Sequence, residues 1–246
     1  MAGQRAPLVH NEKGIDMTAP DFSSLDDAGL NLHAVLALAA LPAPLRSSLD
    51  PEGNYAQLIL IGNGGRRLWD TIKAEGTASV ASANPIDDFS IRKVEAWLSE
   101  QANGVINEVV YPGDRPIGLQ SLGKLAGWHD SSRFMVGINE RWGTWFAYRV
   151  VVLANTEFEP TRLELGQSPC VTCREKPCVR ACPGAAITDA RFDLEKCVDY
   201  RKQPESTCRA TCQSRLACPV RTEHRYSAEQ IRHTYSISMQ IIERHY

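Results

Sequence analysis

The residues with the clearest chemistry are eight cysteines, all of which lie between residues 170 and 218. Bacterial ferredoxins bind iron–sulfur clusters with the pattern Cys-x2-Cys-x2-Cys-x3-Cys-Pro. One run in this chain has the same pattern with two extra residues before its third cysteine, and its members are Cys170, Cys173, Cys178 and Cys182, followed by Pro183. A second group follows, and it consists of Cys197, Cys208, Cys212 and Cys218. This arrangement predicts iron–sulfur chemistry.

The number and order of the cysteines predict two [4Fe–4S] clusters with crossed ligands. In two-cluster ferredoxins, the cysteine that precedes proline ligates the cluster held mainly by the other group. We therefore expect one cluster on set 1, which comprises Cys170, Cys173, Cys178 and Cys218. The other is expected on set 2, which comprises Cys182, Cys197, Cys208 and Cys212. Soft thiolate ligands suit iron, so the expected chemistry is one-electron transfer.

Two other interpretations use the same cysteines. Paired structural zinc sites usually have two Cys-x2-Cys pairs, and here only Cys170 and Cys173 have this spacing. Disulfides require an oxidising compartment. The apolar stretch from Ala34 to Leu41 follows acidic Asp26 and Asp27 instead of the basic residues of a secretory signal. We therefore expect reduced thiols in a cytoplasmic protein.

The composition is that of an ordinary globular protein, with 43% hydrophobic residues and a net charge of −2. No apolar run has the length of a membrane span, so no membrane partner is expected. Charge is distributed unevenly, because residues 167–225 contain 11 Lys and Arg against 7 Asp and Glu. Basic surroundings suit anionic clusters. The remaining residues carry no basic surplus, so nucleic acid is not an expected partner.

Apolar patterns before the cysteines predict alternating helices and strands. The expected helices are Leu25–Leu41, a segment through Trp69 and Ile72, Asp88–Gln101 and Gly118–Ala126. The expected strands are Gln57–Ile61, Val105–Tyr111, Phe134–Ile138 and Thr144–Leu153. This alternation predicts a layered α/β domain whose sheet is at least partly buried on both faces.

Four segments are expected along the chain. Residues 1–20 are polar, contain Gly and Pro and lack periodicity, which predicts a disordered tail; Met1 and Met17 are both candidate starts. The α/β domain is expected over residues 21–162 and the ferredoxin-like domain over residues 163–226. Residues 227–246 are expected to form a C-terminal helix with Ser227 as its N-cap.

Several segments resemble known families. Ala126–Trp128, Arg141–Arg149 and Glu157–Pro160, followed by the cysteine groups, resemble the epoxyqueuosine reductases, which are cobalamin-dependent iron–sulfur enzymes of tRNA modification. Gly143–Leu153 also resembles the CblC-type cobalamin-processing protein. The resemblance implies a mixed α/β (α+β) architecture, in which a flavin-reductase-like, cobalamin-binding sheet domain precedes a dicluster ferredoxin-like domain.

Aromatic residues near the end of the α/β part are candidates for cofactor contacts. They are Trp128, Trp142, Trp145 and Phe146. One interpretation is core packing against the sheet, because tryptophan is usually mostly buried. The other is a flat wall against the ring of a cobalamin or of FMN, which is the alternative cofactor.

Two charged residues are further candidates. Arg149 falls in a strand that should be buried, where a cation needs an anionic partner such as Asp87, Glu140 or a cofactor phosphate. Asp114 stands one residue after the position that corresponds to the proton donor proposed for the reductases. It is interpreted either as a turn residue or as a catalytic proton donor.

Together these features predict an oxidoreductase that passes single electrons from its two clusters to a bound cobalamin. The reaction would be cobalamin processing or reduction of a small substrate. Electrons would come from an external donor such as flavodoxin or ferredoxin reductase. Two alternatives stay open: an electron-transfer ferredoxin whose α/β domain binds flavin or docks on a partner, and a tRNA-modifying reductase.

Overall fold

The structure is a computed structural model that describes residues 17–76, 84–162, 166–188 and 191–246. Residues 1–16 of the predicted disordered tail lie outside the described residues. Thr18, which follows them, pairs with the segment after the last strand: its backbone N–H donates to the carbonyl of Glu157, and Phe158 is its bridge partner. None of the described helices has the length and apolar character of a membrane span.

A four-stranded antiparallel sheet with the order β1-β2-β6-β3 forms the centre of the α/β part. Its strands are β1 (Leu32–Ala37), β2 (Gln57–Gly64), β3 (Asn107–Tyr111) and β6 (Phe146–Ala154). Every residue of β2 is buried, which confirms the prediction of a sheet that is partly covered on both faces. A second, two-stranded sheet pairs β4 (Asp130–Ser131) with β5 (Gly137–Ile138).

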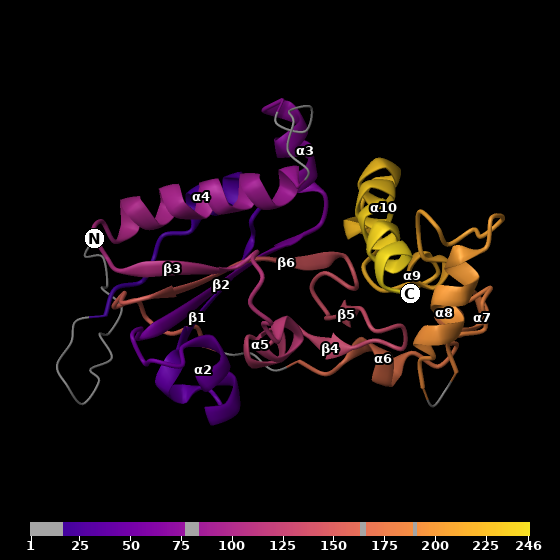
Figure 1. The fold of residues 1–246 in the computed structure, drawn as a ribbon, viewed down its shortest axis with the longest axis horizontal. Coiled ribbons are helices and arrows are strands. Elements are labelled where there is room, and N and C mark those ends of the chain that lie inside the picture. The colour runs from indigo at the N-terminus through magenta and orange to yellow at the C-terminus, as the bar shows by residue number, and fades with distance from the viewer. Residues whose placement is uncertain (1–16, 77–83, 163–165, 189–190) are drawn as a thin grey trace, which may run out of the picture.

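Helices cover both faces of the larger sheet (Figure 1). One face is covered by α1 (Ser23–Asp27), α3 (Arg67–Ala74) and α4 (Pro85–Gln101), which bury residues such as Leu25 and Trp97 against it. The other face is covered by α2 (Ala43–Leu49) and α5 (Leu119–Leu125), which contribute Leu49 and Leu122 to a second core. The sheet therefore separates two hydrophobic cores, as in a layered α/β domain.

The predicted helix Leu25–Leu41 is wrong. This segment contains the short helix α1, the strand β1 and the 3-10 helix η1 (Leu38–Ala40). Gly29, with a φ of +83°, follows α1 in a left-handed conformation that glycine adopts readily. The apolar residues of β1 then pair with β2, from Leu32 opposite Gly62 to Ala37 opposite Gln57. A short apolar run is ambiguous between helix and strand, and here strand pairing decided it.

Most of the other predicted elements are confirmed, with shifted ends. The helix predicted from Asp88 begins at Pro85, and the strand predicted from Val105 begins at Asn107. The predicted strand Phe134–Ile138 is reduced to β5, because Met135 has a φ of +67°, which is incompatible with extended backbone. Phe134 lies instead in the loop that faces the cysteine segment.

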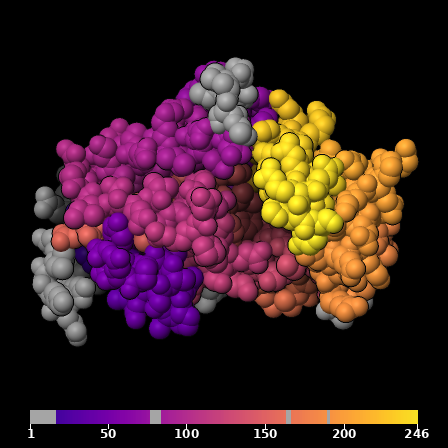
Figure 2. Space-filling model, in the orientation of Figure 1, coloured from indigo at the N-terminus to yellow at the C-terminus, as the bar shows by residue number. Residues whose placement is uncertain are grey.

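The segment after β6 is built from short helices and one long one. The short elements are α6 (Pro169–Thr172), α7 (Pro177–Arg180), α8 (Leu194–Lys202), α9 (Gln213–Leu216) and the 3-10 helix η3 (Thr222–His224). The long helix is α10 (Ala228–His245), and the Ser227 hydroxyl accepts a hydrogen bond from the N–H of Gln230, as predicted for an N-cap. In Figure 2, α10 lies between the α/β body and the cysteine segment.

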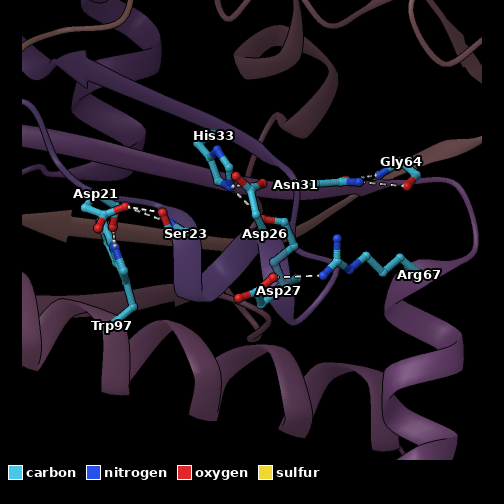
Figure 3. A network of polar contacts seen from close by, with 10 residues as sticks. Asp21, Ser23, Asp26, Asp27, Asn31, His33, Gly64, Arg67 and Trp97 are labelled. Atoms are coloured by element: carbon cyan, nitrogen blue, oxygen red, sulfur yellow. Dashed lines mark hydrogen bonds and ion pairs between the residues drawn. The ribbon is translucent and has the colours of Figure 1, made fainter.

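A polar network joins the chain before β1 to the rest of the α/β part (Figure 3). The Trp97 indole donates to the carbonyl of Asp21 at 2.6 Å, and the Asn31 side chain bonds to both the N–H and the carbonyl of Gly64. Arg67 forms an ion pair with Asp27 at 2.8 Å. These bonds tie this segment to α4, β2 and α3.

Candidate functional site

The four cysteines of set 2 line one cavity of about 380 Å³. Cys182 follows α7, Cys197 lies within α8, and Cys208 and Cys212 lie in the loop that leads to α9. Helix α8 begins at a side-chain cap, because the Asp193 carboxylate accepts a hydrogen bond from the N–H of Lys196 at 3.1 Å. This cap fixes the start of the helix one turn before Cys197.

The four cysteines of set 1 line a second, narrower cavity of about 20 Å³. Cys170 lies in α6, and Cys178 lies in α7, and each follows a proline at the first helical position. Cys218 follows α9 and reaches this cavity from the far end of the cysteine segment. The structure therefore brings together the two groups that the crossed arrangement predicts.

Mutual proximity of the thiols is also evident in their protonation. The pKa of Cys197 is raised to about 11; burial is the largest cause, the neighbouring Cys212, Cys182 and Cys208 add to the rise, and Arg201 opposes it. Burial likewise raises the pKa of Cys170, with a further contribution from Cys218. These contributions reflect how close the thiols of each set lie to one another, and coordination to a metal would deprotonate them.

All eight cysteines are free of disulfides. Within the described residues, no group of three or more His, Cys, Asp or Glu side chains is arranged to hold a single metal ion. The choice between clusters and zinc therefore stays a prediction from the spacing of the cysteines.

Two buried arginines face the set 2 cavity. Arg201 is 8% exposed and Arg215 is 7% exposed, and both line the cavity. Neither guanidinium has a carboxylate within ion-pair distance among the described residues. Arg201 donates to the carbonyl of Cys208 at 3.1 Å and to the hydroxyl of Ser238 at 3.0 Å. A buried cation without a counter-ion is unfavourable, so these two arginines would suit an anionic group bound at set 2.

Arg215 also connects the cysteine segment to the α/β part. Its guanidinium donates to the carbonyl of Thr144 and lies over the ring of Trp145 at 4.5 Å and over that of Tyr226 at 5.1 Å. Neither Arg201 nor Arg215 was predicted as a site residue from the sequence. Their only signal was the basic surplus of residues 167–225, which does not distinguish them from the exposed cations there.

Phe134 lies between the two cavities and was predicted only as a strand residue. Its side chain is 6% exposed, lines both cavities and packs with Cys178 and Ile187. The loop that carries it comes from the α/β part, so both cavities are completed by residues outside the cysteine segment. An apolar ring in this position excludes water from the space between the two cysteine sets.

The four aromatic candidates for cofactor contacts are in the protein core. Trp128, Trp142 and Phe146 belong to the second core of the sheet, and Trp145 is fully buried against Tyr226. None of them lines the cavities of set 1 and set 2. Core packing accounts for the contacts that they make, and a cofactor contact at these residues stays a prediction.

Arg149 lies at a small cleft of about 170 Å³ between β6, the start of α4 and α10. It is half-buried, and its Nε donates to the Asn63 side chain at 2.6 Å. Asp87 and His233 line the same cleft. Burial raises the pKa of Asp87, and the positive charge of Arg149 opposes this rise. Of the predicted anionic partners, Asp87 is thus the one that the structure places near Arg149.

Asp114 is exposed in the loop after β3 and does not line the cavities of set 1 and set 2. An exposed loop position agrees with the turn interpretation, and the role of catalytic proton donor stays a prediction.

No protein-family model and no curated protein matches this sequence. Several solved structures have a similar fold. The epoxyqueuosine reductase from Bacillus subtilis is 11% identical, with a TM-score of 0.52, and the match covers 83% of this chain and 66% of that protein. An epoxyqueuosine reductase with a modified tRNA-Tyr stem loop is 10% identical, with a TM-score of 0.53, and the match covers 85% of this chain and 66% of that protein.

A reductive dehalogenase described as performing B12-dependent dehalogenation is 15% identical, with a TM-score of 0.51. The match covers 98% of this chain and 37% of that protein. At these identities the likeness establishes the fold alone. The chain spans about two thirds of the reductases and little more than a third of the dehalogenase. The fold similarity agrees with the predicted resemblance to the epoxyqueuosine reductases.

Proposed function

We propose that this protein is an iron–sulfur oxidoreductase that binds two [4Fe–4S] clusters, one on set 1 and one on set 2, and passes single electrons through them. The observation that carries this proposal is the convergence of each set of four thiols on its own cavity. The unpaired, buried Arg201 and Arg215 at set 2 support it independently, because they match the negative charge of a thiolate-ligated cluster.

The residues around the clusters have distinct roles in this proposal. The thiolates hold the iron, and the clusters supply one-electron chemistry when bound. Arg201 and Arg215 stabilise the more negative, reduced form at set 2, because buried positive charge favours added negative charge. Phe134 shields the region between the sets from water, which keeps electrostatic interactions there strong.

Iron and sulfide analysis of anaerobically purified protein tests this proposal. We expect about eight irons and eight sulfides per chain, and about four of each when one cluster is lost. Cys173→Ser should remove the cluster of set 1 and leave that of set 2, while Cys197→Ser should do the reverse. Electron paramagnetic resonance of the reduced protein should show one signal in each variant. Colourless protein with negligible iron, or with zinc instead, would overturn the proposal.

For the electron acceptor we propose a cobalamin, since a solved structure with a similar fold is described as B12-dependent. The described residues fit this group only in part. The aromatic candidates lie in the core, and the cleft at Arg149 measures about 170 Å³, whereas pockets for drug-sized ligands measure about 300–1,000 Å³.

Spectroscopic titration tests the acceptor separately from the clusters. Hydroxocobalamin added to the anaerobic protein should change its visible spectrum with a saturable dependence on concentration. Retention of FMN in place of cobalamin would favour the electron-transfer module with a flavin. Absence of binding by both would overturn the acceptor proposal and leave the clusters unaffected.

A further inference from the structure

The cleft at Arg149 lies directly beside the set 2 cavity. Thr234 of α10 lines both of them, so one residue of this helix belongs to both walls. The cleft measures about 170 Å³, and its other walls come from the start of α4 and from β6. A molecule bound in it would therefore lie close to a cluster on set 2.

Arg149 is held in the cleft in a fixed orientation. Its Nε donates to the Asn63 side chain at 2.6 Å, and Asn63 is itself fully buried and bonded to the carbonyl of Gly65. Among the described residues, neither terminal nitrogen of Arg149 has a hydrogen-bond partner, and no carboxylate lies within ion-pair distance of them. Two guanidinium nitrogens match the two oxygens of a carboxylate. The cleft therefore contains one preoriented half of an arginine–carboxylate pair.

The other ionisable groups of the cleft restrict the charge of a ligand. Asp87 is near enough for the charge of Arg149 to lower its pKa against the larger effect of burial, so this carboxylate competes with a ligand for Arg149. Burial lowers the pKa of His233, and the charge of Arg149 lowers it further, so His233 is neutral at about pH 7.5. With one cation and one carboxylate in its lining, the cleft suits a ligand with a single negative charge.

The volume of the cleft restricts the size of a ligand. Sites for drug-sized ligands measure about 300–1,000 Å³, and this cleft measures about 170 Å³. Ile86 and Ile237 supply apolar surface beside Arg149 and Asp87. A short carbon chain that ends in one carboxylate fits this combination of size, charge and apolar wall.

We propose that this cleft binds a small monocarboxylate through Arg149, and that the charge of the set 2 cluster controls how tightly it is held. Binding requires only the cleft, whereas control by set 2 rests on the proposed function. An electron added to set 2 places negative charge near the bound carboxylate, and like charges repel. By linkage, the bound carboxylate makes set 2 harder to reduce by the same factor. No covalent bond forms or breaks in this coupling.

Calorimetric titration with sodium acetate tests the site on anaerobic, cluster-loaded protein, at constant ionic strength and about pH 7.5. Acetamide has the shape of acetate without its charge, and inorganic phosphate carries more charge. Arg149→Gln removes the cation of the cleft. Arg46→Gln is the matched control, because Arg46 makes one side-chain hydrogen bond and lies on α2, which covers the other face of the sheet.

We expect the wild type and Arg46→Gln to bind acetate with a dissociation constant on the order of millimolar. Arg149→Gln should bind acetate at least tenfold more weakly, and the wild type should bind acetamide at least tenfold more weakly than acetate. Equal acetate affinity in Arg149→Gln and the wild type, or equal binding of acetamide and acetate, would overturn the inference. Phosphate bound as tightly as acetate would overturn the monocarboxylate as the ligand class.

A second variant is expected to gain affinity. Asp87→Asn keeps the size of the side chain and removes the charge that competes for Arg149, so it should bind acetate at least threefold more tightly. Disturbed folding would weaken binding, so it does not produce this gain. Unchanged or weaker acetate binding by Asp87→Asn would contradict Arg149 as the group that holds the anion.

Control by set 2 is tested by titrating protein that has been reduced at an electrode, which adds no anionic reductant. Reduced wild type should bind acetate at least about twofold more weakly than oxidised wild type. Cys197→Ser, without the set 2 cluster, should show no such difference. Equal affinities in the two states of the wild type, or a difference that persists in Cys197→Ser, refute control by set 2.

Failure of this inference is distinguishable from failure of the proposed function. Iron content is measured for every preparation beforehand, and protein without iron refutes the proposed function. The dependence of acetate binding on Arg149 and Asp87 does not involve iron. Iron-loaded protein whose acetate affinity ignores both residues refutes the carboxylate site alone.

Discussion

Arg201 is the residue whose replacement should most clearly reveal how the set 2 region is held together. Its side chain, 8% exposed, connects α8 to two other segments. Nε and one terminal nitrogen donate to the carbonyl of Cys208 at 3.1 Å and to the hydroxyl of Ser238 at 3.0 Å. Longer bonds of 3.4 Å reach the carbonyls of Arg209 and Tyr235. Replacing Arg201 therefore releases both the cysteine loop and α10.

The expected loss of stability follows from these bonds. A hydrogen bond from a charged donor contributes about 1.5–3 kcal/mol. Arg201→Met removes the two shorter bonds, which together contribute about 3–6 kcal/mol to the free energy of unfolding. The methionine recovers part of this through apolar packing and through removal of a buried charge. We expect a net decrease of about 3 kcal/mol in the free energy of unfolding. With a slope of about 3 kcal/mol per molar urea, the midpoint should fall by about 1 M.

Urea unfolding followed by far-ultraviolet circular dichroism measures this shift, on anaerobic preparations of equal iron content. Arg209→Met is the matched control, because Arg209 is 41% exposed and pairs with the exposed Glu243 at 2.7 Å. Such surface pairs contribute at most about 1 kcal/mol, so the control midpoint should move by about 0.3 M or less. If Arg201→Met moved the midpoint no further than the control, the reasoning from buried hydrogen bonds would be refuted.

Three further outcomes are expected. Arg215→Gln should lower the fraction of reduced set 2 cluster at least tenfold relative to that of set 1, because it removes a buried cation. A redox titration followed by electron paramagnetic resonance measures both fractions, and the signal of set 1 should not change. Equal shifts of both signals would contradict selective stabilisation by this cation. Gly143→Ala should impair iron incorporation, which iron analysis measures. Gly143 has a φ of +59°, and an added Cβ would lie 2.3 Å from the carbonyl oxygen of Val220, two residues after Cys218 of set 1. Wild-type iron content would argue against this close contact. Burial lowers the pKa of His33, while a hydrogen bond to the carbonyl of Leu30 opposes this effect. As the pH decreases, His33 is therefore protonated in the unfolded state at a higher pH than in the folded state. The free energy of unfolding should fall as the pH decreases below about 6.5. The urea midpoint measured between about pH 7.5 and pH 5 should therefore depend less on pH in His33→Gln, and identical profiles would count against this histidine as a source of the dependence.

The two-sided cover of the sheet was predictable, but one of its edge strands was not. The run from Gln57 is continuously apolar and ends in glycines, which is sufficient to identify a buried strand. The run from Leu32 is also apolar, and its local pattern fits a helix equally well. Its conformation was decided by pairing with β2 at an edge where both faces are covered. Such pairing is a long-range interaction that a local pattern does not contain.

The sequence by itself predicted the grouping of the cysteines, because three members of each set lie close together in the chain and each cysteine that precedes proline follows the crossed pattern of two-cluster ferredoxins. Only the tertiary structure decided what surrounds them. It placed Phe134 from a distant loop between the two cavities, and it buried Arg201 and Arg215 beside set 2 while other cations stayed exposed. It also placed Trp128, Trp142, Trp145 and Phe146 in the core. Burial depends on contacts between segments far apart in the chain, and residue type alone does not specify them.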